Sequence, residues 1–267
     1  MFEHDEVVLE AKHVTRRFLA SGGRTLVAND DINLKFYKGK TLGLVGESGC
    51  GKSTFMRFLV SLDTPSEGEI LYRGKDITKL KGEELRQNRQ NIQMVFQDPT
   101  DSFSPRMKVK DILCEPLENY GLIKPSEKAA KARELLKMVE LPEEFAERYP
   151  RSMSGGQKQR SSIARALMKD APILLLDDAL SAVDTDTERQ ILDNLRRLRR
   201  GRTTIIVAHR ISTIQDADHI LVLDEGKVEE YGTHEELLNN GKLYASLYRK
   251  QQLEKELHEE GGTAHAE

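Results

Sequence analysis

Long hydrophobic runs are missing from this chain of 267 residues. A membrane-spanning helix needs about 20 consecutive apolar residues, and the longest apolar stretches, such as "TIIVAH", are far shorter. The N-terminal stretch "MFEHDEVVLE" is acidic and lacks the apolar core of a secretory signal peptide. We therefore expect a cytoplasmic protein that reaches a membrane only through partner subunits.

A surplus of positive charge is also missing. Lys and Arg number 41 against 44 for Asp and Glu, which gives a net charge of -3. Nucleic-acid-binding proteins usually carry a basic surplus, so we expect no nucleic-acid partner. The two cysteines, Cys50 and Cys114, do not have the paired spacing of a zinc site. A disulfide or metal framework is therefore not expected.

The pattern of apolar residues predicts an α/β fold. Strands are expected at "VVLEAKHVT", "DINLKFY", "TLGLVG", "IQMVF", "PILLL", "TTIIVAH" and "HILVLD", with "GKVEEYG" as a final strand or hairpin arm. The later runs are almost continuously apolar, which is typical of strands buried on both faces of a parallel sheet. Residues 109–149 read as helical, with Ser126 as a cap and Pro142 as a stop.

A glycine-rich turn lies between an expected strand and an expected helix. Its sequence, "GESGCGKST", fits the phosphate-binding pattern G-x-x-x-x-G-K-[ST]. Such a loop directs backbone N–H groups and a helix N-terminus at phosphate. Lys52 would neutralise the β- and γ-phosphates, and the Ser53 hydroxyl would bind Mg²⁺. ATP and Mg²⁺ are therefore the expected cofactors. The expected nucleotide-binding residues are Gly46, Glu47, Ser48, Gly49, Cys50, Gly51, Lys52, Ser53 and Thr54.

Two adjacent carboxylates, Asp177 and Asp178, follow the apolar run "ILLL". Neighbouring like charges are costly unless a cation holds them, and an apolar strand that ends in Asp beside a P-loop is the Walker B arrangement. Asp177 would bind Mg²⁺, usually through its water shell, and Asp178 would face the γ-phosphate and the attacking water. The alternative is a cap for the next helix, a role for which Asp184 and Thr185 are better placed.

The string "MSGGQKQR", residues 153–160, resembles the signature motif of ABC-type ATPases. Its residues Ser154, Gly155, Gly156 and Gln157 would form an anion-binding helix N-terminus. Because the P-loop already holds one nucleotide, this second terminus needs another. In the family it binds the ATP of the other subunit in a head-to-tail dimer. The resemblance therefore implies a second ATPase subunit as partner, in a homodimer or a heterodimer.

Other motifs follow in the order of the same family. Phe18 in "TRRF" matches the aromatic residue that stacks on adenine, although an aromatic at a strand end is often only part of the core. Gln97 in "VFQDP" matches the Q-loop, "SAVD" matches the D-loop, and His209 in "VAHR" matches the switch histidine. The resemblance implies Asp178, His209 and Gln97 as catalytic residues. It implies Ser53, Gln97 and Asp177 as metal-binding residues.

The family resemblance also implies a domain plan. We expect a P-loop NTPase core with an N-terminal antiparallel β subdomain, all within residues 1–250. An α-helical subdomain would be inserted at about residues 100–168. Residues 251–267 would form the charged end of a last helix and a disordered tail.

The resemblance has two parts. As far as about residue 150 the chain resembles ATP-binding subunits of dipeptide and oligopeptide uptake systems, as in "VFQDPTDSFSPRM". From about residue 171 it resembles the nucleotide-binding domain of ABC exporters, as in "IIVAHRISTIQDADHILVLDEGKVEEYGTHEELL". This pattern predicts an importer–exporter chimera joined near residues 155–168. A single divergent lineage is the alternative.

The implied function is an ATP-hydrolysing subunit that drives an ABC transporter through integral membrane subunits on the inner face of the cell membrane. The importer-like helical insertion favours uptake of peptides. An exporter cassette is one alternative. A weakly hydrolysing partner in a heterodimer is another, because Asp178 stands where the family generally has Glu. An ABC ATPase of DNA repair or of ribosomes fits less well, since those usually have a long coiled coil or two cassettes.

Overall fold

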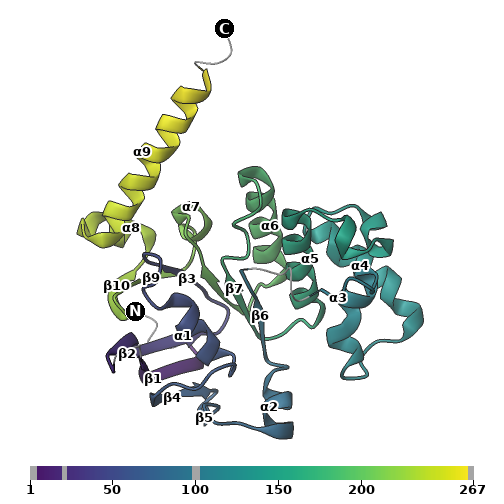
Figure 1. Ribbon diagram of the computed structural model, residues 1–267, viewed down its shortest axis with the longest axis horizontal. Helices are drawn as coiled ribbons and strands as arrows, with labels where there is room; N and C mark the ends of the chain where they lie inside the picture. Colours follow the sequence, from purple (N-terminus) through teal and green to yellow (C-terminus); the bar gives the residue numbers. More distant parts are fainter. Residues whose placement is uncertain (1–4, 20–22, 98–102, 264–267) are drawn as a thin grey trace.

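The computed structural model describes residues 5–19, 23–97 and 103–263, with side chains described as far as Leu257. Within these ranges the body contains two β-sheets and a separate group of helices, and the last helix extends away from it (Figure 1). The predicted combination of an α/β core, an antiparallel β subdomain and a helical subdomain is therefore confirmed.

The N-terminal sheet is antiparallel and has the strand order β2-β1-β4-β5. Its strands are β1 (Val7–Leu19), β2 (Thr25–Tyr37), β4 (Glu67–Tyr72) and β5 (Lys75–Asp76). Leu9 of β1 is buried between its partners Phe36 and Tyr72. In the second half of β2, alternate residues are buried, namely Ile32, Leu34 and Phe36, so this part of the strand turns one face to the core and polar side chains to the other.

The central sheet has the order β10-β9-β3-β8-β7-β6. Its strands are β3 (Thr41–Val45), β6 (Ile92–Val95), β7 (Ile173–Asp177), β8 (Thr203–Val207), β9 (His219–Asp224) and β10 (Lys227–Gly232). The neighbours pair in parallel except β10, which forms a hairpin with β9. Leu174 and Leu176 enter one hydrophobic cluster, whereas Ile173 and Leu175 enter the other. The continuous apolar runs thus belong to strands buried on both faces, as predicted.

Helices cover both faces of the central sheet. Helix α1 (Lys52–Leu59) places Phe55, Met56 and Phe58 in the cluster shared with the antiparallel sheet. The other helices outside the helical subdomain are α2 (Gly82–Asn88), α6 (Thr185–Leu198), α7 (Ile211–Ile214), α8 (His234–Asn240) and α9 (Leu243–Thr263). Because α1 follows β3 after one short loop, the parallel sheet presents the start of this helix at its carboxyl edge.

The helical subdomain consists of α3 (Val109–Glu118), α4 (Lys128–Met138) and α5 (Gly155–Met168), which pack against one another. The expected cap at Ser126 is wrong. Ser126 lies in a short 3₁₀ turn, Pro125–Glu127, and α4 begins only at Lys128. Helix α4 also ends four residues before Pro142, since Glu140 takes a left-handed backbone conformation with φ 56°. Local turn geometry therefore overrides the sequence signals at both ends.

Helix α9 leaves the body near β10 and α8 (Figure 1). Its backbone includes residues 261–263, which belong to the segment expected to be disordered, and residues 264–267 lie outside the described part of the chain. Among the described helices, none combines the length and the apolar character that crossing a bilayer requires.

Candidate functional site

The phosphate loop connects β3 to α1 and is pressed against two other strands. A Cβ atom added to Gly51, whose φ is +99°, would lie 2.0 Å from the carbonyl oxygen of Ala28. A Cβ added to Gly46 would lie 2.1 Å from the carbonyl oxygen of Leu223. Only glycine fits these positions, so the loop keeps its shape through backbone contacts to β2 and β9.

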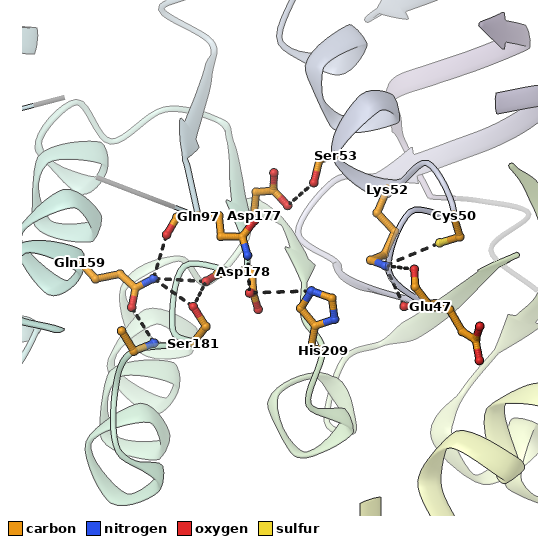
Figure 2. A network of polar contacts seen from close by, with 12 residues as sticks. Glu47, Cys50, Lys52, Ser53, Gln97, Gln159, Asp177, Asp178, Ser181 and His209 are labelled. Carbon is orange, nitrogen blue, oxygen red and sulfur yellow. Dashed lines mark hydrogen bonds and ion pairs between the residues drawn. The ribbon is translucent and has the colours of Figure 1, made fainter. Parts of the chain in front are cut away.

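Lys52 folds back into this loop. Its ammonium nitrogen donates to the carbonyl oxygens of Gly46 and Glu47, both at 2.7 Å, and lies 3.6 Å from Cys50 Sγ (Figure 2). The side chain is buried. The loop thus already wraps around a positive charge, which phosphate oxygens would contact in place of the carbonyls.

The remaining loop residues differ in their exposure to solvent. Glu47, Ser48 and Gly49 are exposed at the rim. Cys50 is buried, and its carbonyl accepts a 3.1 Å hydrogen bond from the amide of Gly226. The backbone of Cys50 thus helps to hold the loop, while its thiol is buried.

Asp177 ends β7 next to the start of α1. Its Oδ1 accepts a 3.2 Å hydrogen bond from the Ser53 hydroxyl. Burial, reinforced by the charge of Asp178, raises the pKa of Asp177, and the hydrogen bond from Ser53 opposes this shift only in part. A buried carboxylate beside a hydroxyl is a pair of hard oxygen ligands that a divalent cation would stabilise.

This donor set fits Mg²⁺. Among the described residues, no group of three or more His, Cys, Asp or Glu side chains could hold a metal ion by itself. Mg²⁺ is usually bound by one or two carboxylates, with substrate phosphates and water completing its shell. Ser53 and Asp177 supply this small protein contribution next to the phosphate loop.

Asp178 turns away from its neighbour because its backbone is left-handed, with φ 47°. Its Oδ2 accepts from the Gln97 amide at 3.2 Å and lies 3.9 Å from His209 Nε2 (Figure 2). These three side chains follow β6, β7 and β8, which are neighbours in the parallel sheet. The structure therefore brings together all three residues expected to be catalytic.

Gln159 is a site residue that the sequence reasoning missed. It is buried in α5, where its Nε2 lies 3.2 Å from the Gln97 carbonyl oxygen and 3.3 Å from that of Asp178. Its Oε1 accepts from the amide of Ala182 at 3.0 Å. One side chain thus ties the signature helix to the Q-loop, the Walker B strand and the D-loop (Figure 2). The available signal was the second glutamine of "SGGQKQR".

The signature residues form the N-terminus of α5. Ser154 Oγ accepts from the Gln157 amide at 3.3 Å, and Gln157 Oε1 accepts from the Ser154 amide at 2.9 Å, which makes a capping box. Ser154 and Gly155 are exposed, while a Cβ on Gly156 would lie 2.7 Å from the Ala182 carbonyl oxygen. This helix end is therefore preformed and open on its outer side.

Two further expected residues, Phe18 and Asp184, lie near the end of β1 and before the start of α6. Phe18 lies near the end of β1, opposite Leu26 of β2; the residue is 37 % exposed, and the Arg16 guanidinium lies 4.7 Å from the centre of its ring. Asp184 caps α6 by accepting from the Thr187 amide at 3.0 Å. The cap role therefore falls to Asp184 and not to Asp177 or Asp178.

Comparison with known proteins agrees with this geometry. Residues 29–181, more than half of the chain, match the ABC transporter family model. The oligopeptide transport ATP-binding protein OppF of Bacillus subtilis (strain 168) is 40% identical over 240 residues, which cover 88% of this chain and 78% of that protein.

Two solved structures are also similar. A dimeric ATP-binding cassette in a post-hydrolysis state bound to ADP and Pi has a TM-score of 0.79 and 33% identity, and the match covers 85% of this chain and 98% of that chain. A bacterial Atm1-family ABC exporter with ATP bound has a TM-score of 0.77 and 33% identity over 92% of this chain and 42% of that one. The chain therefore belongs to the ABC transporter family, as an ATP-binding domain of the kind that hydrolyses ATP to drive transport.

Proposed function

We propose that this ATPase drives the uptake of peptide-type solutes. The proposal is supported by the relative from Bacillus subtilis, whose name assigns it to oligopeptide transport, and by the extent of that match. The importer-like segment includes the helical subdomain, through which the chain would contact integral membrane subunits. These subunits would hold it on the inner face of the cell membrane.

The observation that carries the hydrolytic role is the position of Asp178 between Gln97 and His209. Asp178 would accept the proton of the attacking water, and Gln97 would orient that water. His209 would donate a hydrogen bond at the γ-phosphate. Lys52 and the loop amides would bind the phosphates of ATP, and Phe18 would stack on adenine.

Mg²⁺, bound by Ser53 and Asp177 with a contribution from Gln97, would neutralise charge on the β- and γ-phosphates. The residues of this chain would hold the substrate in line for attack. The buried carboxylate of Asp177 would keep the cation beside the loop, because this carboxylate lies within hydrogen-bond distance of the Ser53 hydroxyl.

The active unit would be a head-to-tail dimer. The outward-facing start of α5 would bind the nucleotide of the partner subunit through Ser154, Gly155, Gly156 and Gln157. Its capping box is complete before any ligand arrives, so little reordering would accompany binding. The partner is a second copy of this chain or a related ATPase.

Two observations favour a second candidate function. The match to an Atm1-family exporter extends over most of the chain. Asp178 replaces the usual glutamate, as in a weakly hydrolysing subunit of a heterodimeric exporter.

The two-part resemblance is a separate prediction: residues 1–150 and 171–250, compared separately with relatives, should match different families. A shared nearest family would contradict the chimera.

Transport direction separates the two candidates. In source cells that lack this chain, uptake of a labelled oligopeptide should fall, and the parent protein should restore it while Lys52→Ala should not. Unchanged uptake with slower loss of a preloaded substrate would instead support export.

A further inference from the structure

The segment that carries His209 is held by a helix far away in sequence. After β8, Ala208 donates to the carbonyl oxygen of Leu44 at 3.2 Å, and α7 begins three residues later at Ile211. Arg210, the N-cap of α7, provides no side-chain cap for this short helix. The backbone around His209 therefore needs partners from outside its own element.

Gln251 of α9 provides two such contacts. Its Nε2 donates to the His209 carbonyl oxygen at 2.6 Å, and its Oε1 accepts from the Ile211 amide at 2.8 Å. The side-chain amide of Gln251 thus caps α7 and at the same time holds the carbonyl group of His209, the expected switch residue. Because both ends of one planar group are used, the position of His209 depends on the position of α9.

The opposite side of the same segment is held by α6. Arg210 donates to the buried carboxylate of Glu188 at 2.8 Å, and Thr213 of α7 donates to the other oxygen of that carboxylate. The backbone of His209 is thus held from two sides. The imidazole itself is about half exposed and lies 3.9 Å from Asp178, so the backbone must determine its direction.

We propose that Gln251 is a positioning residue for ATP hydrolysis, which acts by holding the backbone of His209. The inference rests on the proposed role of His209 in turnover. Displacement of reacting groups by about 1 Å can cost on the order of 10²-fold in rate. Loss of one of two supports should cost less, so we expect Gln251→Leu to lower kcat by about tenfold.

The test compares neighbouring glutamines of the same helix. Gln251→Leu should lower kcat while the affinity for a fluorescent ATP analogue stays within about twofold of the parent, since Gln251 does not contact the phosphate loop. It should also shift the His209 resonance in histidine-selective NMR. Gln252→Leu, an exposed neighbour, should change neither kcat nor the resonance.

A second variant protects the test from a folding defect. Gln251→Glu keeps the side-chain length and the acceptor for Ile211 but loses the donor to His209, so kcat should fall with the melting temperature preserved. A folded Gln251→Leu or Gln251→Glu protein with kcat within about twofold of the parent would overturn the inference. Equal losses in Gln252→Leu would also overturn it.

His209→Ala, measured in parallel, separates this inference from the proposed function. If His209→Ala abolishes turnover and the Gln251 variants do not lower it, only the role of Gln251 is wrong. If His209→Ala keeps full turnover, the proposed role of His209 is wrong, and the positioning role falls with it.

Discussion

The starts of α1 and α5 are the two helix ends expected to bind phosphate, but one is packed within the chain and the other is exposed. The start of α1 is packed against β2 and β9, and its Lys52 is folded onto the loop carbonyls. The start of α5 is exposed and satisfied by its own capping box. The difference is what the proposed dimer requires, in which the start of α1 would hold the nucleotide of its own chain and the start of α5 would bind the nucleotide of another subunit.

The largest effect should come from a substitution that stops hydrolysis but still allows the ATP-bound dimer to form. Asp178→Asn removes the proposed base but keeps the shape of the side chain, so turnover should fall by at least about 10²-fold. ATP should remain bound, and light scattering should show a stable dimer. If Asp178→Asn hydrolyses ATP as fast as the parent, then Asp178 is not the base.

The neighbouring carboxylate provides the matched control. Asp177→Asn should weaken Mg²⁺ dependence and ATP binding together, because its proposed task is to hold the cation. If the dimer forms equally well without ATP, the start of α5 does not join the subunits by binding the nucleotide of the partner.

One substitution at the start of α1 and one at the start of α5 test whether the two helix ends have different roles. Lys52→Ala should lower ATP affinity on the order of 10²-fold, since the variant loses a charge that contacts phosphate in its own subunit. Ser154→Arg should keep ATP binding but lose hydrolysis, because a bulky cation would obstruct the approach of the partner. Equilibrium binding and steady-state turnover separate the two. Equal loss of binding in both variants would refute the signature assignment.

A longer side chain at Asp178 tests whether the proposed base is too short for fast hydrolysis. Aspartate is one methylene shorter than glutamate, which withdraws the carboxylate by roughly 1.5 Å. Asp178→Glu should therefore raise kcat by about tenfold if the surroundings accept the longer side chain. Turnover at saturating Mg-ATP measures this change. A lower kcat in a folded variant would show that the parent geometry is already adapted to aspartate.

The smallest effect is expected at the far end of the signature helix. Lys169 follows α5, and its ammonium lies 3.4 Å from the centre of the Tyr120 ring, with no hydrogen-bond partner among the described residues. Burial, followed by the charge of Arg86, lowers the pKa of Lys169 to about 8. Below that pH both folded and unfolded chains carry the charge, and the folded chain bears the cost of burying it.

Between about pH 8 and the usual lysine pKa of 10.5, the unfolded chain binds more protons, so this group makes stability rise with pH. Lys169→Met should therefore raise the melting temperature at pH 7 by about 1–3 °C, and the gain should shrink toward pH 10. Thermal unfolding at both pH values tests this. An equal gain at both values would mean that the ammonium is not the cause.

Much of the fold, and the phosphate loop within the site, could be predicted from local sequence. The apolar run before Asp177 predicted a strand buried on both faces, and β7 divides its side chains between two cores. The glycine pattern around Lys52 predicted the phosphate loop. The cap at Ser126 failed because a 3₁₀ turn competes there with the start of the helix.

The sequence by itself determined most of the elements and the residues expected to carry the chemistry, because apolar periodicity and loop motifs act over a few residues. Only the tertiary structure decided how those residues face one another. The left-handed backbone of Asp178 separates two adjacent carboxylates, and Gln159 and Gln251 hold the site from helices distant in the chain. Such contacts depend on packing between elements that are far apart in the chain, so the residue types alone did not indicate which groups would pair.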